Sequence, residues 1–310
     1  MSDWVEASTI FLTLAGSRLY GTSTPASDVD RRGVCVPPPE VALGFARPFE
    51  QHQVPGEDTV IFSLRKFMEL AAACNPNFIE LLFAPDDAAL VRRPTWERLV
   101  RRRDEFLSAA AFQTFTGYAA SQLARLRSHR AWLLDPPTRR PTRAEFGLGE
   151  AGAGARVLAR DADEGAVDPE AAEVVARERR YKEAARRWQQ YEAWQRGRNP
   201  ARAALEARSG YDTKHAMHLV RLLRMGHELL TRGVVLVRRP DADELRAIRD
   251  GAWSYDQAMA HVDALQAELA AVHAERRYVV PERVDRDALS DLCAELHLQH
   301  WHEARLTPRA

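Results

Sequence analysis

The sequence is poor in cysteine, and this shortage excludes two classes of small stabilised protein. Only three of the 310 residues are cysteines, and no two of them form a C-x-x-C pair; they are Cys35, Cys74 and Cys293. This count and spacing argue against a disulfide framework and against a structural zinc site. We therefore expect three structural thiols in a cytoplasmic protein.

Long hydrophobic runs and an excess of charge of either sign are also missing, and lysine is scarce. No stretch of about 18 apolar residues occurs, so the sequence predicts no membrane span, and the first residues lack the basic segment of a signal peptide. The 44 basic and 44 acidic residues cancel, so composition alone gives no reason to expect a nucleic-acid partner. The basic residues are arginines apart from Lys66, Lys182 and Lys214, which is typical of a GC-rich coding bias.

The length suits about two domains, and the hydrophobic pattern predicts an α+β fold. Apolar runs predict strands at residues 8–16, 29–38 and 58–64. A helix is expected over 65–74, with Ser63 as its N-cap. These elements predict a small α/β domain with a short mixed sheet over residues 1–93.

From residue 94 to residue 310 the pattern is helical almost throughout, so an all-helical C-terminal domain is expected there. Long helices are predicted over 171–198 and 211–232. Before the first of these helices, residues 137–170 are rich in Pro, Gly, Ala and charge, and are expected to form a flexible excursion of unassigned role.

Residues 16–33, GSRLYGTSTPASDVDRRG, contain the residue types of a metal and phosphate site. Asp28 and Asp30 are two residues apart, so on a strand both carboxylates face the same side. Mg²⁺ is usually held by one or two carboxylates together with substrate phosphates. The backbone N–H groups of Gly16 and Ser17, with the serine hydroxyl, could cradle those phosphates, and Gly21 would permit a tight turn.

A D-x-D pair alone is equally typical of a solvated strand start, but the complete pattern is more specific. An apolar strand, G-S, a short turn with glycine and then S-D-x-D resembles the signature of nucleotidyltransferases of the DNA polymerase β superfamily. The form found here is similar to the predicted nucleotidyltransferases that are associated with RNA ligases in bacteria and phages. Residues 75–85 and 198–230 also resemble later blocks of that family, whereas 137–170 has no counterpart.

This resemblance implies a Mg²⁺ (or Mn²⁺) site in a catalytic domain over residues 1–93. Asp28 and Asp30 would bind the metal, and a third carboxylate would come from a neighbouring strand. By position Asp58 is the candidate for that third metal ligand and catalytic residue. The neighbouring Glu57 is the alternative, although it faces the other way if the strand has already begun.

A basic stripe in the helix expected over 211–232 is a second candidate for phosphate contacts. Lys214, His218 and Arg221 are spaced i, i+4 and i+7, so they share one helical face without an interleaved carboxylate. A solvated polar face is the alternative, but the resemblance favours binding of a triphosphate or an RNA end, to which Arg18 would add a further charge.

Two further sequence features each allow two interpretations. Glu80 lies in an otherwise apolar turn, where it either pairs with an arginine or reaches the active cleft. The clustered His297, His300 and His302 have no cysteine or acidic partner nearby, which favours a surface helix end over a zinc site.

The resulting hypothesis is a Mg²⁺-dependent nucleotidyltransferase that moves a nucleoside monophosphate from a nucleoside triphosphate, preferably ATP, to an acceptor hydroxyl. The acceptor could be an RNA end or a protein, and pyrophosphate would leave. Two alternatives stay open: a non-catalytic protein that binds nucleotides or RNA ends, and a helical partner of the toxin-neutralising type in which residues 94–310 do the work. The sequence leaves the base, the acceptor and the oligomeric state undetermined.

Overall fold

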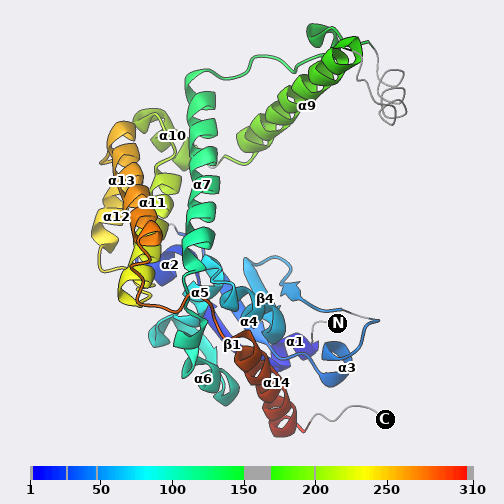
Figure 1. Ribbon diagram of the computed structural model, residues 1–310, viewed down its shortest axis with the longest axis vertical. Coiled ribbons are helices and arrows are strands. Elements are labelled where there is room, and N and C mark those ends of the chain that lie inside the picture. Colours follow the sequence, from blue (N-terminus) through cyan, green and yellow to red (C-terminus); the bar gives the residue numbers. More distant parts are fainter. Residues whose placement is uncertain (1–2, 26, 47, 150–168, 199, 306–310) are drawn as a thin grey trace. The chain divides into compact units, whose positions relative to one another are not determined.

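A computed structural model of the chain describes residues 3–25, 27–46, 48–149, 169–198 and 200–305 (Figure 1). The chain forms two compact units. The first unit comprises Met1–Ala124 with Thr213–Ala310, and the second comprises Arg125–Asp212. The functional boundary expected between residues 93 and 94 stays a prediction.

The first unit contains a five-stranded mixed sheet, as the α+β prediction requires. Its strands are β1 (Thr9–Leu14), β2 (Arg31–Cys35), β3 (Gln51–Gln53), β4 (Thr59–Ser63) and β5 (Ala89–Arg92), in the order β3-β4-β2-β1-β5. Strands β2 and β4 run parallel, whereas the other neighbouring pairs are antiparallel.

The register of the parallel pair brings two acidic residues together. Arg31 pairs with Thr59 at the start of β2 and β4, so the preceding residues, Asp30 and Asp58, lie side by side. The amide of Ala15 donates to the carbonyl of Asp30 at 2.9 Å, and that of Arg31 donates to the carbonyl of Asp58 at 2.8 Å. These bonds fix both aspartates at the end of β1.

The strand that was expected to carry Asp28 and Asp30 begins later than predicted. Strand β2 starts at Arg31, so both aspartates precede it. The reason is that β1 ends at Leu14 and the chain then turns at Gly16, where φ is 60°, leaving Asp28 without a paired strand beside it. Strands β3 and β5 were not predicted because they are only 3 and 4 residues long.

Ten helices of the described part belong wholly to the first unit. They are α1 (Asp3–Ala7), α2 (Gly16–Tyr20), α3 (Pro39–Ala42), α4 (Leu64–Ala72), α5 (Pro76–Leu82), α6 (Pro94–Val100), α11 (Thr213–Arg232), α12 (Ala242–Arg249), α13 (Tyr255–Ala274) and α14 (Arg286–Glu303). Short 3₁₀ turns, η1 and η2, span Asp86–Ala88 and Arg103–Phe106.

Two of these helices begin at the caps that local chemistry favours. The Ser63 hydroxyl accepts from the amide of Lys66, which confirms the predicted N-cap of α4. Asn75 then caps α5 by accepting from the amide of Asn77, with Pro76 at the first helical position. The buried face of α4 places Phe67 against Trp96 of α6, with ring centroids 5.3 Å apart.

The second unit is helical in its described part. Helix α7 (Ala111–Leu134) contributes its last residues to this unit, followed by η3 (Arg143–Phe146), α9 (Pro169–Arg196) and α10 (Pro200–Ser209). Trp132 of α7 packs against Tyr191 and Trp194 of α9, with centroids 5.8 and 5.4 Å apart. Most of the predicted excursion, residues 150–168, lies outside the described residues.

No helix in the described ranges combines the length and the apolarity needed to cross a membrane.

Candidate active site

Asp30 and Asp58 form the acidic centre of the first unit. Their carboxyl groups lie close enough for each to shift the pKa of the other. Burial, followed by the interaction with the carboxyl group of Asp58, raises the pKa of Asp30, whereas the interaction with Asp30 and the charge of Arg32 lower the pKa of Asp58. Two carboxyl groups in contact repel unless a proton or a cation lies between them. Their donor chemistry therefore fits an oxygen-coordinated cation such as Mg²⁺.

Asp58 and Glu57 pair with two different arginines. Arg32 Nη1 donates to Asp58 Oδ1 at 3.0 Å. Glu57 instead pairs with Arg31 at 3.0 Å and accepts from the hydroxyl of Thr59 at 3.0 Å. Of the two acids that the sequence left open, the structure brings Asp58 to Asp30.

Gly16 is required at this site for two physical reasons. Its φ of 60° lies in the left-handed region that favours glycine. A Cβ atom at this position would lie 2.4 Å from Oδ2 of Asp30. The Asp30 carboxylate thus lies directly against the backbone of the predicted phosphate-binding turn. Ser17 follows at the start of α2, and Gly21, with φ 78°, ends that helix.

Asp28 and Arg18 lie on the loop before β2. Asp28 is exposed, and its backbone carbonyl accepts from Arg18 Nε at 3.3 Å. Arg18 Nη2 donates to the carbonyl of Ser27 at 3.0 Å. Arg18 therefore stabilises the loop that carries Asp28, and a phosphate contact by the same guanidinium stays a prediction.

A cleft of about 400 Å³ opens beside Asp30. Gly16, Asp30 and Arg32 line it together with Lys66, and aromatic walls come from Phe62 of β4 and Phe78 of α5. The amide side chains of Gln51 and Asn77 complete its polar lining. Apart from Gly16 and Asp30, these residues were not assigned from the sequence, because they are scattered over β2, β3, β4 and two helices, α4 and α5, without a motif.

Arg221 lies at the buried end of the basic stripe and is engaged by two partners. Its Nη1 donates to Glu80 Oε1 at 2.6 Å, and its guanidinium lies 3.6 Å from the centroid of the Tyr20 ring. The Tyr20 hydroxyl donates to Glu80 Oε2 at 2.6 Å. Glu80 thus satisfies both possibilities raised by the sequence, because it pairs with an arginine and also lines the cleft.

Lys214 and His218 precede Arg221 on the same helix. Lys214 is exposed, and its positive charge opposes the rise in the pKa of Asp30 that burial and Asp58 cause. His218 is half-buried with its ring centroid 6.2 Å from that of Tyr20. Burial, then the charges of Arg221 and Lys214, lower the pKa of His218 well below its usual value. Burial therefore increases along the stripe from the exposed Lys214 to Arg221, which pairs with the buried Glu80. The phosphate contacts expected of these three residues stay predictions.

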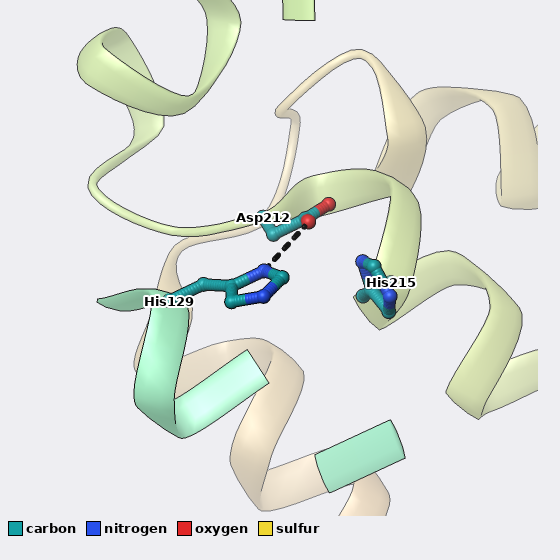
Figure 2. Close-up of side chains that lie close together, drawn as sticks. All are labelled: His129, Asp212 and His215. Atoms are coloured by element: carbon teal, nitrogen blue, oxygen red, sulfur yellow. Dashed lines mark hydrogen bonds and ion pairs between the residues drawn. The ribbon is translucent and has the colours of Figure 1, made fainter. Parts of the chain in front are cut away.

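The second unit contains a histidine–carboxylate pair that sequence reasoning missed. His129 Nδ1 lies 3.4 Å from Oδ2 of the buried Asp212 (Figure 2). The rings of Trp132 and Trp194 lie near the same histidine, with centroids 5.5 and 5.6 Å away. The partners are 83 residues apart, so no local pattern indicates the pair. His215, also labelled in Figure 2, is a residue of the first unit.

Of the three histidines near the C-terminus, His302 is exposed, as a surface helix end requires, whereas His300 differs from that expectation. His300 is buried, and the indole of the adjacent Trp301 donates to the carbonyl of Pro37 at 2.9 Å. Tertiary contact with the segment after β2 therefore covers this end of α14.

The carboxylates, the glycine against them and the adjoining cleft all lie within one part of the chain that resembles a known family. Residues 3–134 match the family described as RNA repair pathway DNA polymerase beta family (RlaP). This match supports a polymerase-β-type nucleotidyltransferase, and it confirms the family resemblance within residues 3–134. The resemblance of residues 198–230 lies outside the matched range and stays a prediction.

One curated relative is similar over a comparable length. It is an uncharacterized 38.9 kDa protein from the nrdC-mobD intergenic region of Enterobacteria phage T4, 26% identical over 129 residues. The similarity spans 38% of this chain and 38% of the phage protein. No solved structure matches the chain.

Proposed function

We propose that this protein is a metal-dependent nucleotidyltransferase that transfers a nucleoside monophosphate from ATP to a hydroxyl of an RNA end. The single observation that carries the proposal is the meeting of Asp30, Asp58 and Gly16. The family description, which refers to RNA repair and to DNA polymerase β, supports both the reaction class and the RNA acceptor.

The carboxylates of Asp28, Asp30 and Asp58 would hold Mg²⁺ or Mn²⁺. Polymerase-β-like nucleotidyltransferases usually use divalent metals, and such ions neutralise charge on the attacking and leaving oxygens of an in-line displacement. Asp58 immediately precedes β4, which runs parallel to β2, so it lies beside Asp30. Asp58 would also accept the proton of the attacking hydroxyl.

The remaining residues position the substrate. The Gly16-Ser17 turn would bind the triphosphate, and Arg32, Lys66 and Lys214 would add positive charge to the phosphate side of the cleft. The acceptor hydroxyl would form a bond to the α-phosphorus while the bond to the pyrophosphate oxygen breaks. Because phosphoryl-type transfer requires mainly positioning and electrostatic stabilisation, these groups suffice for the proposed chemistry.

The acidic centre is tested by comparing two neighbouring carboxylates. Asp58→Asn should lower the rate of label transfer from α-labelled ATP to RNA by at least about 100-fold, as loss of a stabilising group in a reaction centre does. Glu57→Gln is the matched control, because Glu57 pairs with Arg31 rather than with Asp30. Assays should contain each α-labelled nucleoside triphosphate, Mg²⁺ or Mn²⁺, and RNA or total lysate. Equal rates for the two variants would contradict the assigned role of Asp58.

A further inference from the structure

The second unit carries a groove between the segment around η3 and helix α9. Its volume is about 430 Å³. Three arginines, Arg139, Arg180 and Arg187, line it together with the aromatic side chains of Phe146 and Trp188. Glu183 is the single acidic residue in this lining. The groove thus combines positive charge with two aromatic side chains.

The walls of the groove are fixed by specific contacts. Arg143 of η3 makes a bidentate pair with Glu178 of α9, with distances of 3.0 and 2.9 Å. The guanidinium of Arg143 also lies 5.3 Å from the centroid of the Tyr181 ring, against which Phe146 packs at 5.8 Å. Bidentate arginine pairs are geometrically specific, so these contacts hold η3 against α9.

The arginines of the groove are accessible to a ligand. The side chain of Arg139 is 78% exposed and that of Arg180 is 59% exposed. Arg180 pairs with the half-exposed Glu173, and such surface pairs contribute only about 0–1 kcal/mol, so an anion can compete for this guanidinium. Arg187 is exposed and makes no hydrogen bond or ion pair with any residue of the described ranges.

We infer that this groove binds single-stranded nucleic acid, with the arginines on the phosphates and the aromatic side chains against unpaired bases. Grooves of this composition bind single strands because every base has a π-face and the backbone is a polyanion. Helix α9 supports the assignment, since its sequence contains seven basic and five acidic residues. That the strand is RNA rests on the proposed function.

The helix itself offers a matched control for this inference. Arg180 and Arg187 are seven residues apart and share the groove face of α9. Arg179 and Arg186 have the same spacing and exposure, but at 100° per residue they lie on an adjacent face outside the groove. The variants R180Q/R187Q and R179Q/R186Q therefore remove equal charge from two faces of one helix.

The test is fluorescence anisotropy of a 12-nucleotide single-stranded RNA with the full chain, in the absence of nucleotide and metal. We expect R180Q/R187Q to raise Kd at least 10-fold and R179Q/R186Q to raise it less than 3-fold, with unchanged circular dichroism for both. Trp188→Ala should also weaken binding, and a duplex of the same sequence should bind more weakly than the single strand.

Three results would overturn the inference: no RNA binding by the wild type at 50 mM salt, equal losses for the two arginine pairs, or equal affinity for the duplex. The outcome is separable from that of the proposed function. Asp30→Asn should bind RNA as the wild type does, because Asp30 is outside the groove. RNA binding without any label transfer would refute the nucleotidyltransferase and leave the groove assignment standing.

Discussion

At the scale of single residues, the site depends on a glycine whose missing side chain makes room for a carboxylate. Gly16 and Gly56 both have positive φ, at 60° and 79°. A Cβ on Gly16 would collide with Asp30, whereas a Cβ on Gly56 would meet nothing within 4 Å. The two positions therefore carry the same backbone constraint but differ in what surrounds them.

This difference gives a matched pair of variants. Gly16→Ala and Gly56→Ala should each lower stability by about 1–2 kcal/mol, because both place an L-residue in the left-handed region. Only Gly16→Ala should also abolish label transfer, since it displaces the Asp30 carboxylate. Chemical denaturation and the transfer assay measure the two effects. Full activity of Gly16→Ala would refute the assigned contact between the turn and Asp30.

At the scale of elements, three helices meet through one buried ionic network. Tyr20 ends α2, Glu80 lies in α5, and Arg221 lies in α11. Burial raises the pKa of Tyr20, and the neighbouring Glu80 keeps the buried Arg221 charged. The network therefore holds α2, which begins at Gly16, against two helices from distant parts of the chain.

Removing one charge of this network should be more damaging than removing both. Arg221→Met should lower the free energy of unfolding by about 3–5 kcal/mol, because it leaves the Glu80 carboxylate buried without its partner. The double variant E80Q/R221M should recover part of that loss. Urea denaturation of the wild type, both single variants and the double variant completes the cycle. Additive losses would show that the two side chains do not act as a pair.

The elements also show how far the sequence could predict the site. The position of Asp58 was sufficient to predict that it meets Asp30, because neighbouring parallel strands bring such residues together. The strand argument for Asp28 was wrong, because β2 begins only at Arg31, and the metal-binding role of Asp28 stays a prediction. The contact of Glu80 with Arg221 was not predictable, because it joins residues 141 positions apart. Arg32 and Lys66 were missed for a related reason, since a cleft formed by several elements has no sequence motif.

At the scale of the whole molecule, buried histidines couple stability to pH. Burial lowers the pKa of His297 and of His300 on α14. The folded protein therefore protonates them at a lower pH than the unfolded chain does, in which histidines take up a proton below about pH 6.5. Stability from these residues is therefore complete above that pH and is lost as the pH falls below it.

The urea concentration at the midpoint of unfolding should accordingly decrease when the pH is lowered from 7.5 to 5.5. This decrease should be smaller in H297Q/H300Q than in the wild type. Measuring both proteins at each pH separates this contribution from that of the carboxylates. Parallel pH dependences would show that the two histidines are not coupled to folding.

The overall architecture was largely predictable, whereas its division into units was not. The mixed sheet, α4 and the long helices follow from hydrophobic periodicity and caps such as Ser63. The compact units depend on which distant helices pack together, and Thr213–Ala310 joins the N-terminal sheet rather than the helices that precede it. Periodicity shows which face of a helix is buried but not which partner covers it.

The central claim is transfer of a nucleoside monophosphate, and the fate of the two ends of ATP tests it most directly. The protein is incubated with Mg²⁺, RNA and ATP labelled in parallel reactions at the α- or γ-phosphorus. We predict that the α-label becomes attached to the RNA, that the γ-label leaves as pyrophosphate in equal amount, and that D30N abolishes both. Attachment of the γ-label to the acceptor, or no transfer to any acceptor despite ATP binding, would contradict the assignment.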